Sequence, residues 1–226
     1  SVIGQAKHRD PYRALLPEPV FVPFGDLAAA RAAIDDRTAA FVVEPIQGEG
    51  GVNVSPPGYL AALQVLCHEH GALIILDEIQ TGIGRTGKLF ACEHEGVSPD
   101  VMTLGKGLGG GFPIAAFVTT EDVAATVSLG DHGGTYAGNP LACAAANAVL
   151  RVVTQEQLSE RAAELGERVM QRLRTFAAEN KGVVDDVRGR GLLIGMSLTD
   201  AERAATLSLR AAEAGVLLNV TAGRVM

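Results

Sequence analysis

Short apolar runs alternate with helical patterns along most of the chain. Apolar runs bounded by glycine, proline or charged residues, which are typical of buried strands, occur at residues 39–45, 72–78, 100–106 and 114–120. Segments between these runs have the spacing or the end signals of helices. This alternation of strand and helix predicts a mainly parallel sheet with helices on both faces.

Two of the predicted helices begin at residues that favour a helix start. Asp26 precedes a helical pattern over 27–34, and its side chain suits the N-cap position. Asn139 and Pro140 precede an Ala-rich pattern over 141–153, and they suit the N-cap and the first helical position. These signals place a helix start at both points.

Residues 154–226 have a different pattern from residues 1–153. A capping-box pattern that begins at Thr154 predicts a long amphipathic helix ending near residue 179. Predicted strands over 191–198 and 215–220 enclose one more helix. We therefore predict a small α/β unit packed beside the main one.

Composition narrows the class of protein. The chain has 226 residues, of which 47 % are hydrophobic and 20 % charged, which suits a well-buried α/β protein. A net charge of -7 argues against nucleic acid or an anionic membrane as a partner, and no apolar run approaches the roughly 18 residues that cross a bilayer. The three cysteines are scattered singly, as buried thiols in a reducing compartment would be, so we expect a cytoplasmic protein.

Polar residues follow three of the predicted strands. Glu44 follows the first, Asp77 and Glu78 end the second, and Lys106 ends the third. Because ligands of open parallel sheets lie beyond the carboxyl ends of the strands, these residues and Gln80 are expected to meet at one rim. Glycines beside all three strand ends would allow a ligand to approach the backbone closely. The sequence therefore predicts a ligand site there.

The residues at the strand ends, and two histidines before the second strand, also have interpretations other than this ligand site. Asp77 and Lys106 could form a structural ion pair, with the glycines serving turns. A phosphate loop of the GxxxxGK[ST] type is disfavoured because Gly107 follows Lys106. His68 and His70 lie two residues apart and so point to different helix faces, which disfavours zinc. No metal is expected.

Four motifs occur in a characteristic order: EPIQGEGG, LDEIQTGIGRTG, LGKGLGGGFPIAA and HGGTYAGNPLACAAA. In this order they resemble the class III (subgroup II) aminotransferases, which are pyridoxal-phosphate enzymes of fold type I, and most of all the acetylornithine and ornithine aminotransferases. The resemblance implies an α/β fold in which residues 1–153 are the C-terminal part of the large, cofactor-binding domain. Residues 154–226 would be part of the small C-terminal domain.

The resemblance assigns cofactor contacts to residues after two strands. Asp77 would pair with the pyridine nitrogen of pyridoxal 5′-phosphate and keep it protonated, so that the ring accepts electrons. Lys106 would be the catalytic residue, which binds the cofactor aldehyde and later moves a proton. Gln80 would bind the phenolic oxygen and Ile79 would pack on the ring face. Glu78 is counted with these cofactor-binding residues.

The resemblance also implies contacts to substrate and to a second copy of the chain. Thr135 matches a threonine that reaches the cofactor phosphate across a dimer interface, so at least a homodimer is expected. Glu49 matches a substrate-binding position, and Gly134 stands at a substrate-binding position where several acetylornithine enzymes carry a serine. Glu44 matches a residue that lies near Gln80 without contacting the cofactor. An ordinary role in loop structure stays open for Glu44 and Glu49.

The implied reaction is transamination of an ω-amino acid, such as N-acetylornithine, ornithine or 4-aminobutyrate, with 2-oxoglutarate. The resemblance further implies a chain truncated at both ends, because it lacks the family's cofactor-phosphate loop and its carboxylate-binding arginines. The alternative is a truncated scaffold without this activity, either a binding module or a hydrolase that works without the cofactor. Neither GxSxG nor SxxK is present to support a serine hydrolase.

Overall fold

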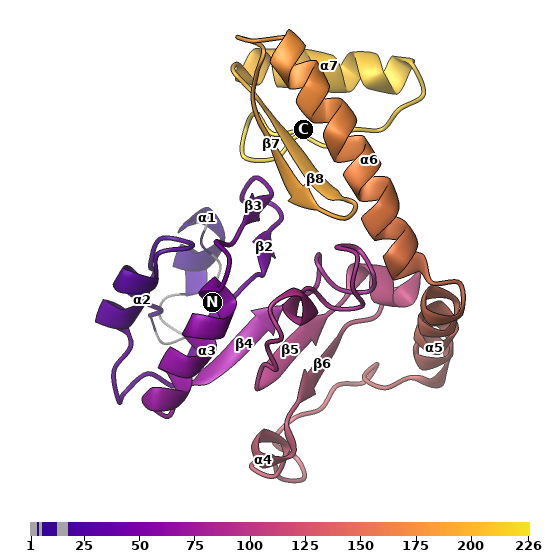
Figure 1. Cartoon of the computed structure of the whole chain (residues 1–226). Helices are drawn as coiled ribbons and strands as arrows, with labels where there is room; N and C mark the ends of the chain where they lie inside the picture. Colours follow the sequence, from indigo (N-terminus) through magenta and orange to yellow (C-terminus); the bar gives the residue numbers. More distant parts are fainter. Residues whose placement is uncertain (1–3, 5, 13–17) are drawn as a thin grey trace.

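A computed structural model describes residues 4, 6–12 and 18–226, which form a larger lobe and a C-terminal lobe (Figure 1). The larger lobe contains a four-stranded sheet in the order β1-β4-β5-β6. Its strands are β1 (Ala40–Val43), β4 (Leu73–Asp77), β5 (Val101–Leu104) and β6 (Ala116–Thr119). The first three run parallel and β6 is antiparallel to β5. The prediction of a mainly parallel sheet in an α/β fold is confirmed.

Helices and short loops accompany this sheet, but Val42, Phe117 and Val118 are exposed, so the predicted cover of helices on both faces is incomplete in the described chain. The α-helices of the larger lobe are α1 (Ala6–Arg9), α2 (Leu27–Ala33), α3 (Tyr59–Glu69), α4 (Glu121–Ala124) and α5 (Pro140–Gln155). Three 3-10 helices, η1 (Asp10–Tyr12), η2 (Ala91–His94) and η3 (Lys106–Gly109), and a hairpin of β2 (Ile46–Gln47) and β3 (Asn53–Val54) complete it. The core gathers fully buried side chains of α3 and β4, including Leu63, Leu66, Ile74 and Leu76.

Both predicted N-caps are confirmed. The Asp26 side chain accepts a hydrogen bond from the Ala29 amide at 2.9 Å. The Asn139 side chain accepts one from the Ala142 amide, also at 2.9 Å. Each cap satisfies one of the amides that a helix start leaves without an intrahelical partner.

The C-terminal lobe contains α6 (Leu158–Glu179), β7 (Val184–Arg190), β8 (Leu193–Leu198) and α7 (Ala201–Glu213). β7 and β8 form an antiparallel pair, and α6 leads into this lobe from α5 (Figure 1). The last residues of the chain return beside β8, where the Met196 amide donates to the Met226 carbonyl at 2.9 Å. Met170, Val184 and Leu198 belong to its separate small core.

Two predictions for this lobe are wrong in detail. Thr154 does not cap α6, because it lies inside α5 and its hydroxyl donates to the Leu150 carbonyl at 2.8 Å, an i−4 bond that threonine forms readily. α6 begins instead after Gln157. The strand expected over 215–220 is not formed, since those residues follow α7 without strand pairing. β7 was not predicted, because its sequence VDDVRGR is too polar for an apolar run.

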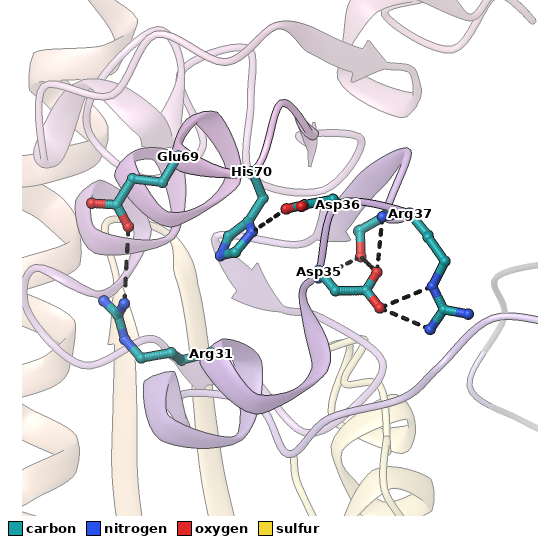
Figure 2. A network of polar contacts seen from close by, with 7 residues as sticks. Arg31, Asp35, Asp36, Arg37, Glu69 and His70 are labelled. Carbon is teal, nitrogen blue, oxygen red and sulfur yellow. Dashed lines mark hydrogen bonds and ion pairs between the residues drawn. The ribbon is translucent and has the colours of Figure 1, made fainter.

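The amino ends of the parallel strands are joined by polar contacts on the surface of α2 and α3 (Figure 2). His70 Nδ1 lies 3.0 Å from Asp36 Oδ1, just before β1 and β4 begin, and Arg31 lies 3.9 Å from Glu69. His68 Nε2 bonds Asp100 Oδ2 at 3.0 Å, just before β5. The two histidines therefore contact different carboxylates, and this end of the sheet has a structural role.

Candidate active site at the carboxyl ends of the strands

The opposite end of the sheet brings together the polar residues that follow β1, β4 and β5. In the parallel register Val43 is opposite Leu76 and Asp77 is opposite Thr103, so the chain leaves all three strands at one edge. Burial raises the pKa of Glu44 above its ordinary value. The Gly48 amide that bonds it works against this shift, the charge of Asp77 adds to it, and the charge of Lys106 opposes it. Glu44, Asp77 and Lys106 thus act on one another at this rim.

Asp77 has few hydrogen-bond partners among the described residues. Its Oδ1 accepts a hydrogen bond from the Ile79 amide at 3.0 Å, and it forms no ion pair with any described residue. The structural ion pair with Lys106 is therefore not formed. Thr103, which faces the same side of the sheet, has a buried hydroxyl without a hydrogen-bond partner in the described part of the chain. A carboxylate and a hydroxyl are thus available side by side for a polar ligand.

Lys106 begins η3 in a conformation that side chains rarely adopt. Its φ is 43°, in the left-handed region, and its side chain is exposed without a hydrogen bond or ion pair to any described residue. Such a backbone costs of the order of 1–3 kcal/mol and is often found at functional sites. Ile79 packs on Gly105, the residue before the lysine: a methyl group added at Gly105 would lie 3.5 Å from Ile79 Cγ2. The strand end therefore presents a free amine next to an apolar side chain.

Gln80 and Glu44 meet through Gly48. The Gly48 amide donates to Glu44 Oε2 at 3.0 Å. A methyl group added at Gly48 would lie 2.5 Å from Gln80 Cδ, so a side chain at this position would displace the Gln80 amide group. The expected support of Gln80 by Glu44 is thus indirect, by way of the Gly48 backbone.

Glu78 differs from the other predicted residues. Its side chain is 1 % exposed, and its carboxylate accepts hydrogen bonds from the Thr81 hydroxyl at 2.5 Å and from the Ala91 and Cys92 amides at 3.0 and 2.8 Å. Successive residues at a strand end point to opposite faces, so Asp77 and Glu78 cannot both face the rim. Glu78 thus holds the 81 and 91–92 segments in place, and its role as a cofactor contact stays a prediction. Burial, followed by the charge of Glu78, raises the pKa of Cys92 to about 12.

The predicted residues in the other two loops form no hydrogen bond or ion pair with Glu44, Asp77, Gln80 or Lys106 in the described chain. Thr135 and Gly134 are exposed in the loop before α5, and they form no hydrogen bond or ion pair with the rim residues described above. Glu49 is exposed in the turn between β2 and β3, where its carbonyl accepts from the Thr221 hydroxyl at 2.5 Å. The roles of these three residues stay predictions.

Sequence reasoning missed Thr103 and Arg188. Thr103 is the one polar side chain in the strand VMTL, and that signal could have identified it. Arg188 is hydrogen-bonded to Val52, 136 residues away in the chain, and no local pattern indicates such a pairing.

Neither a membrane span nor a metal site is found in the described ranges. No helix there is both long and apolar enough to cross a bilayer, and no three His, Cys, Asp or Glu side chains gather so as to hold a metal ion.

The sequence matches the family model described as aminotransferase class-III over residues 5–226. It is 50 % identical over 204 residues to the acetylornithine aminotransferase of Methanopyrus kandleri, a match that covers 90 % of this chain and 51 % of that protein. It is 43 % identical over 213 residues to the ornithine aminotransferase of Bacillus cereus, with 94 % and 53 % covered. The chain spans about half the length of the curated relatives it matches.

Solved structures give the same picture of the fold. An ornithine aminotransferase from Toxoplasma gondii, described with partial occupancy of PLP at its active site, superposes with a TM-score of 0.89 at 42 % identity. The match covers 96 % of this chain and 52 % of that one.

Proposed function

The chain belongs to the class-III aminotransferases, and from this we propose that its strand-end rim binds pyridoxal 5′-phosphate as part of an amino-group-transferring enzyme. The family uses this cofactor. We propose an ω-amino acid such as N-acetylornithine, ornithine or 4-aminobutyrate as donor and 2-oxoglutarate as acceptor, in line with the names of the relatives. The observation that carries the proposal is the meeting of the β1, β4 and β5 ends, where neither Asp77 nor Lys106 forms an ion pair with any described residue.

The side chains at the end of β4 and β5 fit the ring of this cofactor. Asp77 has one backbone amide as its hydrogen-bond donor among the described residues, so one carboxylate oxygen can accept from a protonated ring nitrogen. A carboxylate next to that nitrogen keeps it protonated. When bound, the cofactor supplies an electron-accepting ring. The unpartnered Thr103 hydroxyl lies on the same face and can bind a polar group of the ligand.

Lys106 is the proposed catalytic residue. Its exposed amine is free of ion pairs within the described chain, so it would hold the cofactor through the aldehyde group. The same amine would be the group that takes and moves the proton of the substrate Cα. The left-handed backbone at Lys106 sets the direction in which this amine leaves the strand end.

The neighbouring residues would hold and orient the reactants. Ile79 would pack on the ring face, and Gln80 would bind the phenolic oxygen from its position against Gly48. Glu49 would interact with the group that binds the substrate carboxylate, and Gly134 would leave room for the substrate. These roles follow from the family motifs and from the placement of β4 and of the β2–β3 hairpin.

We also propose that the working unit is a homodimer and that the compartment is the cytoplasm. Large apolar side chains are exposed in the segment that contains Thr135, among them Leu129, Tyr136 and Leu141. A second copy would cover them and bring Thr135 to a cofactor phosphate. The free cysteines, two of them buried, suit a reducing compartment.

Trapping the cofactor on the chain tests the proposal. The purified chain would be incubated with pyridoxal phosphate and reduced with borohydride, and the labelled peptide would be mapped by mass spectrometry. Stoichiometric label at Lys106 is expected, with none in Lys106→Ala and an unchanged amount in Lys88→Ala. Absence of label, or label spread over Lys7, Lys88 and Lys181, would overturn cofactor binding by this chain.

A further inference from the structure

We propose that Arg188, in β7 of the C-terminal lobe, is a positioning residue that holds the 46–54 hairpin in the shape the candidate active site requires. The 46–54 hairpin comprises β2, β3 and the turn between them, and it carries Gly48 and Glu49. The hairpin points from the larger lobe toward β7 and β8 (Figure 1). The inference rests on the function proposed above, because that function gives the hairpin its importance.

The guanidinium group of Arg188 joins the two lobes. Its Nε donates to the Val52 carbonyl at 3.1 Å, and its Nη2 donates to the Gly51 carbonyl. On its own side, Nη1 donates to Ser197 Oγ at 2.7 Å and to Asp186 Oδ2 at 2.8 Å. The planar fork is thus fixed by the β7–β8 sheet and directed at two consecutive carbonyls of the turn. A flexible ammonium could not bond both in this geometry.

The turn needs this support because its backbone is strained. Val52 is buried and has a φ of 53°, which is an outlier for a β-branched residue. Such a conformation persists only where surrounding contacts determine it. β8 supplies one such contact, because a methyl group added at Gly195 would lie 2.8 Å from Val52 Cβ. The C-terminal lobe therefore shapes the turn by packing as well as by hydrogen bonds.

The end of the chain adds a second tie to the same turn. The Thr221 hydroxyl donates to the Glu49 carbonyl at 2.5 Å. A methyl group added at Gly51 would lie 3.2 Å from Ala222 Cβ, so the turn is in close contact with the C-terminal segment. Arg188 remains the only described side chain that bonds the carbonyls of both Gly51 and Val52.

The hairpin transmits its position to the rim. Gly48, at the start of the turn, lies against the Gln80 amide and donates to Glu44. The amides of Gly51 and Val52 both donate to the Gly48 carbonyl at 3.1 Å, so the turn moves as a unit. Loss of Arg188 should therefore loosen the turn and change the surroundings of Gln80.

Nuclear magnetic resonance of the full 15N-labelled chain tests this without any cofactor. Arg188→Ala should raise the hydrogen-exchange rates of the Gly51 and Val52 amides by about tenfold or more, because local opening becomes easier. The side-chain amide signals of Gln80 should shift, while amides in β1 and β4 keep their exchange rates. Arg188→Lys should fall between, since its ammonium keeps the charge but lacks the planar fork that meets both carbonyls and Ser197 at once.

Arg224→Ala is the matched control. Arg224 donates to Asp185 and, at 2.9 Å, to the Leu198 carbonyl, both within the C-terminal lobe, and it forms no hydrogen bond with the hairpin. Its removal should leave the Gly51 and Val52 exchange rates unchanged. If Arg188→Ala fails to fold, Ser197→Ala removes one anchor of the guanidinium and should give a smaller effect of the same sign.

Two results would overturn the inference. Exchange in the turn that is the same in Arg188→Ala and in the control would show that Arg188 does not hold the hairpin. A loosened turn with unshifted Gln80 signals would show that the hairpin does not position the rim. Both readouts are independent of cofactor trapping at Lys106, so failure of the proposed function would be recognised separately.

Discussion

Three residues near the candidate active site, Val52, Ile83 and Lys106, have φ angles between 43° and 55°. Each costs of the order of 1–3 kcal/mol relative to an ordinary conformation, and two of the three are β-branched. Val52 is held by Arg188 and β8, and Ile83 packs on Gly107 next to the lysine. The backbone is thus strained on both sides of the strand ends, where orientation of side chains is critical.

At the same scale, Glu44 makes stability depend on pH. Burial raises its folded-state pKa above the ordinary 4.5, so the folded state binds the proton more tightly than the unfolded chain does. Its contribution to stability is therefore present below that value and is lost as the pH rises through the folded pKa. Glu44→Gln removes the charge and keeps an acceptor for the Gly48 amide.

Relative to the original chain, Glu44→Gln should therefore be more stable at pH 7 than at pH 4.5: its free energy of unfolding minus that of the original chain should be larger at pH 7. Urea unfolding at the two pH values measures this difference. An identical difference at both values would show that the burial of Glu44 does not affect its titration.

At the scale of elements, close backbone contacts decide how α6 lies on the rest of the molecule. Gly166 in α6 faces the turn between β7 and β8: an added methyl group would lie 2.1 Å from the Gly191 carbonyl oxygen. Gly191 in turn lies against the backbone of Thr86, and the Leu192 amide donates to the Arg85 carbonyl at 2.9 Å. Helix, turn and loop thus form one packed stack in which a side chain at Gly166 has no room.

Gly166→Ala should destabilise the chain by about 2 kcal/mol. Alanine gains about 1 kcal/mol of helix propensity, but overlap with a backbone carbonyl costs about 3 kcal/mol or more, because backbone cannot move aside as a side chain can. Chemical denaturation followed by circular dichroism measures the change. Glu167→Ala, at an exposed neighbouring position, is the control and should change stability by less than about 0.5 kcal/mol. A stabilised Gly166→Ala would contradict the close packing.

At the scale of the whole molecule, some surfaces are covered by contacts between the two lobes, whereas one apolar segment is exposed to solvent. The two lobes meet through the 46–54 hairpin, which contacts β7 and β8, and through the loop at residues 84–87, which contacts α6 and the turn between β7 and β8. The segment from Val127 to Leu141 instead leaves several large apolar side chains in solvent, and Leu129 is fully exposed. A surface of this kind indicates contact with another chain.

Leu129→Glu should therefore weaken self-association. If a second copy covers this segment, a buried unpaired carboxylate there would raise the dimer dissociation constant by at least about tenfold. Sedimentation velocity over a range of concentrations measures it. Leu209→Glu is the control, because Leu209 is also exposed, at 69 %, but lies on α7 in the C-terminal lobe. Equal effects of the two substitutions, or a monomer at every concentration, would exclude the proposed interface.

Local sequence patterns were sufficient to predict the main sheet, two helix starts and the polar residues at the strand ends. The apolar run of β4 and the caps Asp26 and Asn139 act over a few residues, so their structure can be inferred from the sequence alone. Thr154 shows the limit of such patterns, since its hydroxyl donates to a carbonyl in its own helix and does not cap the next helix.

Tertiary structure decided three features of the site. These are the direction of Glu78, the lack of a partner for the Thr103 hydroxyl in the described chain, and the bond from Arg188 to Val52. Each depends on which segment, distant in the chain, supplies or withholds a partner for a buried polar group. Sequence thus determined the strands of the main sheet, two helix starts and the chemistry available at the strand ends, because propensity and periodicity are local. Only the folded chain determined which of those groups stay free to bind a ligand, because burial and hydrogen bonding depend on residues up to 172 positions apart.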